Sequence, residues 1–200
     1  MIRRERNGRA TRHRDLAEMT AKLLGRRMTI DIAEPCPAWR VVRGRRALCA
    51  EAARAALAAA PPGWNAGSAA VELSIVLGDD ALLRRLNRQW RGQDKATNVL
   101  SFPAQDALAA GAPPAGMPLP LGDVVLAFGT VEGEAATQGK RLADHLAHLV
   151  VHGVLHLLGL DHAEEAEAER MEALETAVLA GIGIADPYRD SIPAAEARHG

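Results

Sequence analysis

The chain has 200 residues, 48% of them hydrophobic, and a formal net charge of −1. This length suits one domain with a buried core, and the near-neutral charge gives no overall basic signature of a nucleic-acid-binding protein. No apolar run reaches the roughly 18 residues that a membrane span needs, so we expect a soluble protein without contacts to a membrane.

The first 27 residues form a compositionally separate segment. They hold nine Arg or Lys and three acidic residues, a net charge of +6, which leaves −7 for the rest of the chain. Because they are poor in large apolar side chains and lack a signal-peptide core, we expect a disordered basic tail with at most a short helix near Asp15 to Leu24. Met28 follows this composition break and could be the true start of translation. We therefore predict one domain over residues 28–190 and a short C-terminal tail at 191–200.

The first half of this domain shows clear local patterns. Residues 28–32 (MTIDI) alternate in the manner of a strand, and the alanine-rich run at 46–60 predicts a helix that ends at a Pro-Pro-Gly turn. Residues 70–78 predict a second strand. Asp79 is a suitable N-cap for a helix over residues 80–90.

Loops and short strands follow. Residues 91–97 predict a polar loop, and residues 98–102 predict a short strand that Pro103 ends. The Ala/Pro/Gly-rich stretch at 104–120 predicts an irregular surface loop. A further strand is expected at 122–128.

The last third is predicted to be helical. One helix should begin near Val131 and weaken at Gly139, and a longer one should run from about Leu142 to Leu158, with Gly159 adopting the left-handed conformation beyond its end. Residues 164–180 predict a final amphipathic helix. Its apolar side would contain Met171, Leu174, Val178 and Leu179.

The two cysteines do not suggest a metal or redox site. Cys36 and Cys49 lie in no CxxC pair and beside no histidine cluster. Two isolated thiols are typical of a reduced protein, so we expect structural cysteines and a cytoplasmic location.

Three of the seven histidines fall in one stretch, HGVLHLLGLDH, at residues 152–162. His152 and His156 are four residues apart on the predicted helix, so both imidazoles lie on one face, about 6 Å apart along the axis. Gly159 ends the helix and allows His162 to bring a third nitrogen to the same point. Histidine pairs at this spacing also occur without a metal, but the third histidine favours one. Three neutral nitrogen ligands with a vacant fourth position are typical of catalytic Zn²⁺.

The order H-x-x-x-H-x-x-G-x-x-H is also the metal framework of the metzincin zinc peptidases. Gly153 stands where those enzymes carry the catalytic glutamate. Because that glutamate takes the proton from the metal-bound water, we do not expect peptide hydrolysis by this route. A metal at such a site can still act as a Lewis acid and supply hydroxide near neutral pH.

Two neighbouring residues have several interpretations. His148 could orient a metal ligand, or it could be a partly buried structural histidine. Asp161, just before the third histidine, could orient an imidazole, act as a base or cap the next helix.

The loop after the second predicted helix offers cations. Cleavage of a phosphodiester needs a positive charge to offset the charge that develops on the phosphoryl oxygens. Arg91 and Lys95 could supply it, with Asp94 fixing one of them. The same Arg-x-x-Asp-Lys pattern is also typical of an ordinary solvated turn.

Four stretches together, LNRQWRGQDKATNVLSF, LGDVV, HGVLHLLGLDH and MEALETAVLAGIGIADPY, closely resemble the YbeY family of bacterial single-strand-specific metallo-endoribonucleases. The resemblance covers roughly residues 28–188. It implies a compact α+β, zincin-like domain with a mixed sheet of about four strands and the metal site on a long helix and the turn after it. It also implies one Zn²⁺ bound by His152, His156 and His162, and assigns the family's functionally important arginine to Arg91.

The resemblance further implies a role in ribosome biogenesis. The expected substrate is the 3′ end of the 16S rRNA precursor, and the expected partners are the small ribosomal subunit and its assembly factors, with a role in ribosome quality control and no organic cofactor. An alternative is a ribosome-assembly factor in which zinc is mainly structural and nuclease activity is weak. The acidic charge outside the tail supports this alternative, because RNA affinity normally depends on basic contacts.

Overall fold

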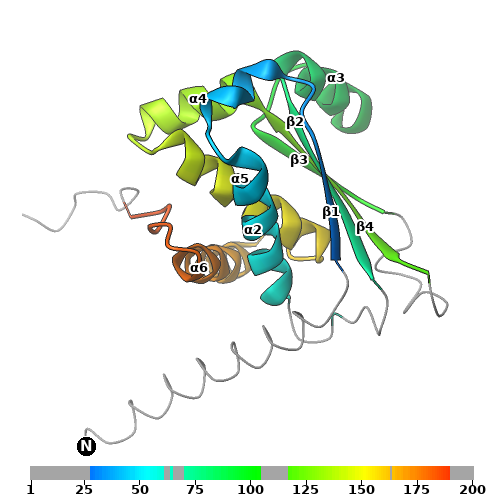
Figure 1. Cartoon of the computed structure of the whole chain (residues 1–200), viewed down its shortest axis with the longest axis vertical. Coiled ribbons are helices and arrows are strands. Elements are labelled where there is room, and N and C mark those ends of the chain that lie inside the picture. Colours follow the sequence, from blue (N-terminus) through cyan, green and yellow to red (C-terminus); the bar gives the residue numbers. More distant parts are fainter. Residues whose placement is uncertain (1–27, 61–63, 65–69, 105–116, 163, 190–200) are drawn as a thin grey trace, which may run out of the picture.

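The computed structural model describes residues 28–60, 64, 70–104, 117–162 and 164–189. The predicted tails at 1–27 and 191–200, and most of the predicted loop at 104–120, lie outside the described residues. The described chain forms a four-stranded mixed sheet covered by helices (Figure 1). The predicted α+β class is therefore confirmed.

The sheet has the strand order β1-β2-β4-β3. Its strands are β1 (Met28–Ala33), β2 (Val71–Gly78), β3 (Val99–Pro103) and β4 (Leu119–Ala127). The pairs β1·β2 and β2·β4 are parallel, whereas β3 runs antiparallel to β4. Strand β3 thus forms one edge of the sheet, where its backbone has a neighbour on only one side.

The helices match the predicted ones closely. They are η1 (Pro37–Val41, a 3-10 helix), α2 (Arg45–Ala58), α3 (Asp80–Arg91), α4 (Phe128–Thr137), α5 (Leu142–Leu157) and α6 (Glu165–Gly181). The N-cap prediction is confirmed, since Asp79 Oδ1 accepts a hydrogen bond of 2.7 Å from the amide of Leu82. Helix η1 was not predicted. Within the described residues, no helix combines the length and the apolar composition that crossing a membrane requires.

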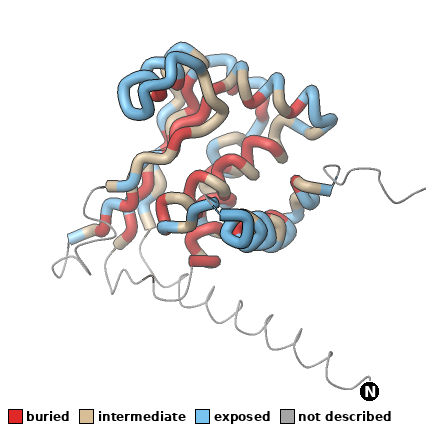
Figure 2. Tube along the Cα trace, turned by 180° about the vertical axis from the view of Figure 1, so that it is seen from behind, coloured by how far each residue is buried: buried red, intermediate tan, exposed pale blue. Residues whose placement is uncertain are grey.

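Most of the core lies between one face of the sheet and helices α2, α5 and α6 (Figure 1). The small side chains of Ala52, Ala53 and Ala56 are fully buried, which lets α2 pack closely against its neighbours. Burial is concentrated in the strands and along α5 (Figure 2). Cys49 belongs to this core, and burial raises the pKa of its thiol to about 12, as expected for a structural cysteine.

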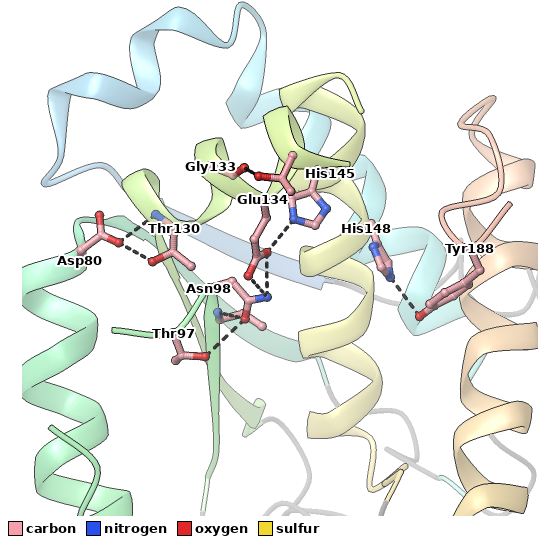
Figure 3. Close-up of polar contacts among 11 residues, drawn as sticks. Asp80, Thr97, Asn98, Thr130, Gly133, Glu134, His145, His148 and Tyr188 are labelled. Carbon is pink, nitrogen blue, oxygen red and sulfur yellow. Dashed lines mark hydrogen bonds and ion pairs between the residues drawn. The ribbon is translucent and has the colours of Figure 1, made fainter. Parts of the chain in front are cut away.

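Helix α3 packs over β3 and β4 from the other face of the sheet, around a small cluster formed by Leu83, Leu100, Val125 and Ala127. The first residue of α3 also organises α4. Asp80 accepts hydrogen bonds of 2.8 Å from the amides of Gly129 and Thr130 (Figure 3). Burial raises the pKa of Asp80, but these hydrogen bonds and that of the Thr130 hydroxyl lower it below its ordinary value. The cap explains why α4 begins at Phe128 rather than near Val131 as predicted.

Candidate metal centre

Three imidazoles converge at the C-terminal end of α5. His152 and His156 come from consecutive turns of that helix, and Gly159, with φ of 87°, turns the chain so that His162 approaches them. The candidate ligand nitrogens of the three side chains all lie within 4.8 Å of one another. The predicted convergence is therefore present, and these three residues could hold a metal ion.

Hydrogen bonds orient two of the imidazoles. Nδ1 of His152 lies 2.8 Å from Glu175 Oε1, and Nδ1 of His156 lies 3.0 Å from the carbonyl oxygen of Leu160. A carboxylate and a carbonyl can only accept, so each Nδ1 carries the proton and donates it. Both Nε2 atoms are then left with a lone pair for a metal.

The two Nε2 lone pairs face each other at 3.1 Å. Without a cation between them, two such acceptors repel. Two nitrogens at the usual zinc–nitrogen distance on one tetrahedral ion stand about 3.3 Å apart, so this spacing fits a bound metal. Burial and the charges of His152 and His162 lower the pKa of His156 to about 4. The imidazole is therefore neutral at pH 7, as metal binding requires.

Glu175 of α6 contacts His152 on the side of the ring opposite its Nε2 atom. Its side chain is 1% exposed, and its Oε2 accepts hydrogen bonds from the Tyr188 hydroxyl and from His148 Nε2, the latter at 2.7 Å. Burial raises the pKa of Glu175, but the hydrogen bonds from His148, His152 and Tyr188 lower it to about 2. The carboxylate is thus ionised, and a Glu–His–metal arrangement of this kind raises the basicity of the ligand.

Glu175 and Tyr188 were not among the predicted site residues. The available signal was a charged residue on the apolar side of the last helix, four positions after Met171 and three before Val178. His148, predicted as an orienting or a structural residue, lies next to the site rather than in the convergent histidine group. Both His148 and His152 hydrogen-bond to the carboxylate of Glu175, so His148 is linked to His152 through that carboxylate.

The histidines open into a cleft of about 620 Å³ between the end of α5, the edge strand β3 and the end of α3. Arg91, the last residue of α3, lines this cleft together with the histidines. The structure therefore brings the predicted cation to the predicted metal site. The other lining residues are Thr97, Asn98, Val99, Ser101, Pro103, Gly159, Leu160 and Asp161.

The other candidates from the α3–β3 loop take different places. Asp94 was predicted to fix Arg91 or Lys95, and this prediction is wrong. Its two oxygens instead accept hydrogen bonds of 2.8 Å from Nε and Nη2 of Arg84, because the left-handed Gly92, with φ of 69°, folds the loop back along α3. Neither Asp94 nor Lys95 is among the described residues that line the cleft.

Asp161 lines the cleft and accepts a hydrogen bond of 2.8 Å from the amide of His162. It does not cap the next helix, whose N-cap position is occupied by Glu164. The observed contact therefore holds the backbone of His162 rather than its imidazole, which differs from the three predicted roles.

A second polar network fixes the other wall of the cleft. Asn98, directly before β3, donates to both oxygens of Glu134 at 3.0 and 3.2 Å, and Glu134 lies 2.9 Å from His145 Nε2 (Figure 3). The Asn98 side chain also accepts a hydrogen bond of 2.7 Å from the amide of Val99. The network joins β3, α4 and α5, so the strand that lines the cleft is held relative to the helix that carries the histidines.

Gly153 has a structural reason to be glycine. The helix approaches the sheet so closely there that a Cβ atom would lie 2.7 Å from Val124 Cγ1 and 3.1 Å from Ser101 Oγ. The Ser101 hydroxyl also donates to the Gly153 carbonyl at 3.1 Å. The position used by the peptidase glutamate is therefore filled by the sheet, in agreement with the expectation that this is not a peptidase site.

This contact leads to a stability prediction. Gly153→Ala should lower the free energy of unfolding by about 1–3 kcal/mol, because the buried and stiff Val124 side chain cannot yield. Gly133→Ala, in helix α4, is the matched control: a Cβ there meets nothing within 4 Å, so the variant should be neutral or gain up to about 1 kcal/mol. Thermal or denaturant unfolding measures both, and equal stability of the two variants would contradict the close approach.

Comparison with known proteins places this architecture in a family. Residues 46–183 match the family model described as "Endoribonuclease YbeY". An endoribonuclease YbeY of Paramagnetospirillum magneticum is 55% identical over 80% of this chain and 97% of that protein, and one of Rhodospirillum rubrum is 54% identical over 82% of each. A solution structure of a Thermotoga maritima protein, 22% identical, aligns with 83% of this chain and 99% of that one at a TM-score of 0.45.

The family model covers more than half of the chain, and it spans nearly all of α2 and continues to the end of α6, which includes the three histidines and Arg91. These two relatives match over 97% and 82% of their own length. The chain belongs to the endoribonuclease YbeY family.

Proposed function

We propose that this chain is a zinc-dependent endoribonuclease that cleaves single-stranded RNA. The observation that carries the proposal is that one cleft contains three convergent imidazoles and the guanidinium of Arg91. The reaction class is supported by the relatives, which are named endoribonucleases. We assign metal binding to His152, His156 and His162, and stabilisation of the transition state to Arg91.

Zinc, when bound, would supply a Lewis acid and a source of hydroxide near neutral pH. The protein's own groups prepare the site for it. Glu175 and the Leu160 carbonyl hold the Nδ1 protons of His152 and His156, which keeps both Nε2 lone pairs directed into the cleft. Asp161 fixes the backbone of the third ligand.

Arg91 would bind the scissile phosphate. Its planar guanidinium can donate two parallel hydrogen bonds to phosphoryl oxygens, and it remains charged at any working pH. Within the described residues, Arg91 makes no ion pair, so its charge is available to the substrate. With a metal ion bound by the three histidines, the cleft would offer positive charge from both the ion and Arg91 to the phosphate on which negative charge develops.

The test is cleavage of an RNA of one sequence offered either as a single strand or in a duplex. We expect internal cleavage of the single strand, loss of cleavage on chelation and little cleavage of the duplex. The product ends identify the attacking group, since a 2′,3′-cyclic phosphate excludes direct attack by water. Failure of the metal-loaded protein to cleave any single-stranded RNA would contradict the proposal.

For the biological substrate we propose the 3′ end of the 16S rRNA precursor, in the cytoplasm, with the small ribosomal subunit and its assembly factors as partners and a role in ribosome quality control. Membership of the family supports this assignment. A 16S rRNA with a 3′ extension should be shortened by the purified protein, and a cleavage pattern without preference for the extension would count against it.

A second candidate function is that of a ribosome-assembly factor with a mainly structural zinc. It is supported by the acidic outer surface of α6 and its N-terminus, which repels RNA and suits a basic protein partner. Exposed acidic residues there are Glu164, Glu165, Glu167, Glu169 and Glu172. A folded His156→Ala variant that restored rRNA processing in cells lacking the protein would favour this function over the nuclease.

A further inference from the structure

Trp90 is the exposed aromatic side chain of the described chain. It is 64% exposed, whereas Trp39 is fully buried and no other aromatic residue of the described ranges is among the exposed large hydrophobic ones. A single exposed apolar residue is ordinary on a protein surface. The position of Trp90 at the cleft and the positive charge on its helix distinguish it from an ordinary exposed residue.

Trp90 lies at the rim of the candidate metal cleft. It directly precedes Arg91, which lines the cleft, and its ring contacts Phe102 of β3 with centroids 6.0 Å apart and planes inclined by 60°. Ser101 and Pro103, the neighbours of Phe102, line the cleft, and Phe102 points to the opposite face because side chains alternate along a strand. A chain that left the cleft across the edge strand would therefore meet the indole ring.

The indole has a free face for such a contact. The inclined contact with Phe102 covers at most one face of the ring, and 64% of the residue is open to solvent. Trp90 continues the inward stripe of α3 after Leu83 and Asn87, both of which are buried. It reaches the end of the helix, where its ring contacts Phe102, which packs against the small cluster under α3.

Unpaired positive charge lies on the helix that carries this ring. Arg85, Arg88 and Arg91 make no ion pair within the described residues, in contrast to Arg84, which Asp94 neutralises. Arg91 directly follows Trp90 and lines the cleft, whereas Arg88, two residues before Trp90, points away from the ring on the helix. An aromatic platform beside a free arginine is how proteins bind single-stranded nucleic acid, by stacking a base and contacting the backbone.

Negative charge on the opposite side limits the path of the backbone. Phe102 and Pro103 also line a shallow hollow on the sheet together with Glu72 and Asp123, whose side chains are exposed. These carboxylates repel phosphates. A nucleic-acid backbone is therefore confined to the arginine side of Trp90, between the ring and the cleft.

We propose that Trp90 is a stacking platform for one base of the RNA, next to the nucleotide whose phosphate lies in the metal cleft beside Arg91. The inference rests on the proposed RNA substrate and adds a specificity determinant to it. A base in a duplex is already stacked on both faces, whereas an unpaired base is free to stack on the indole. Trp90 thereby favours single strands over duplexes.

The test compares Trp90→Leu and Trp90→Ala with Trp90→Phe in steady-state cleavage of a single-stranded RNA. The leucine variant keeps an apolar contact with Phe102 and protects folding. Loss of one stacked base weakens affinity about five- to hundredfold, so both non-aromatic variants should raise KM by about that factor with kcat within about twofold of the wild type. Trp90→Phe should recover most of the loss. Val41→Ala, which changes another exposed apolar residue (65% exposed), should match the wild type.

A substrate scan identifies the base. The series consists of RNAs that each carry one abasic residue at a different position. At the position of the stacked base, the abasic residue should weaken binding to the wild type by the factor that Trp90→Leu shows with intact RNA. The same abasic RNA should bind Trp90→Leu no more weakly than intact RNA does. Binding of intact RNA should also quench tryptophan fluorescence in the wild type and much less in Trp90→Phe.

Two results distinguish a failure of the stacking inference from a failure of the proposed function. If the wild type cleaves single-stranded RNA but Trp90→Leu retains its KM, the stacking inference is overturned while the proposed function stands. If the wild type neither binds nor cleaves single-stranded RNA, the proposed function fails and the stacking inference fails with it.

Discussion

Arg91→Ala should lower kcat/KM for RNA cleavage by about two to three orders of magnitude, the usual effect of removing a group that stabilises transition-state charge. The residue lines the same cleft as the three histidines but takes no part in their hydrogen bonds. Metal content and thermal stability should therefore equal those of the wild type. Cleavage rates and elemental analysis of the same preparation measure both quantities.

Arg54→Ala is the control for this variant, because Arg54 is an exposed arginine of α2 that does not line the cleft. It should cleave RNA at the wild-type rate. Arg91→Lys should recover only part of the activity, since an ammonium group cannot form the paired hydrogen bonds of a guanidinium. Full activity of Arg91→Ala would remove Arg91 from the mechanism.

Glu175→Gln should weaken zinc binding about 10- to 100-fold, which is the usual cost of losing the group that orients a metal-ligating histidine. The buried carboxylate accepts hydrogen bonds from three donors, on His148, His152 and Tyr188. A glutamine amide has a single acceptor oxygen, and its NH₂ group would face a donor. Competition with a chromophoric chelator gives the affinity independently of any activity.

Tyr188→Phe is the matched control for this second prediction. It removes one donor and leaves the carboxylate of Glu175 bonded to both histidines, so the zinc affinity should fall much less. Unfolding of both variants without metal separates an effect on the fold from an effect on the ligand. An unchanged zinc affinity in Glu175→Gln would show that the carboxylate does not support His152.

The histidine convergence could be predicted because it depends on local geometry. Helical spacing aligns His152 with His156, and Gly159 reverses the chain before His162. The helix and strand periodicities likewise predicted every strand and every α-helix of the described residues. The family resemblance connected Arg91 with the histidines, and the structure places both in one cleft.

The remainder of the site depends on contacts between distant segments. Glu175 reaches His152 across 23 positions and Asn98 reaches Glu134 across 36. No periodicity relates such residues before the helices are packed. The same reason explains the wrong partner predicted for Asp94, which pairs with Arg84, ten residues earlier on α3, instead of its neighbours in the loop.

Two element boundaries differ for similar reasons. Strand β4 begins at Leu119, before the predicted residue 122, because residues 119 and 120 pair with β2. That pairing depends on the neighbouring strand, and the proline at 120 hides it in the sequence. Helix α4 begins early because Asp80 caps it from another helix.

We expect RNA cleavage to require a metal ion on His152, His156 and His162. Elemental analysis paired with cleavage of a 3′-extended 16S rRNA, for the wild type and His156→Ala, tests this requirement most directly. We predict one zinc ion per wild-type chain, loss of cleavage on chelation and recovery when zinc is returned, with neither metal nor cleavage in a folded His156→Ala variant. A metal-free His156→Ala protein that cleaves this RNA at the wild-type rate would contradict this requirement.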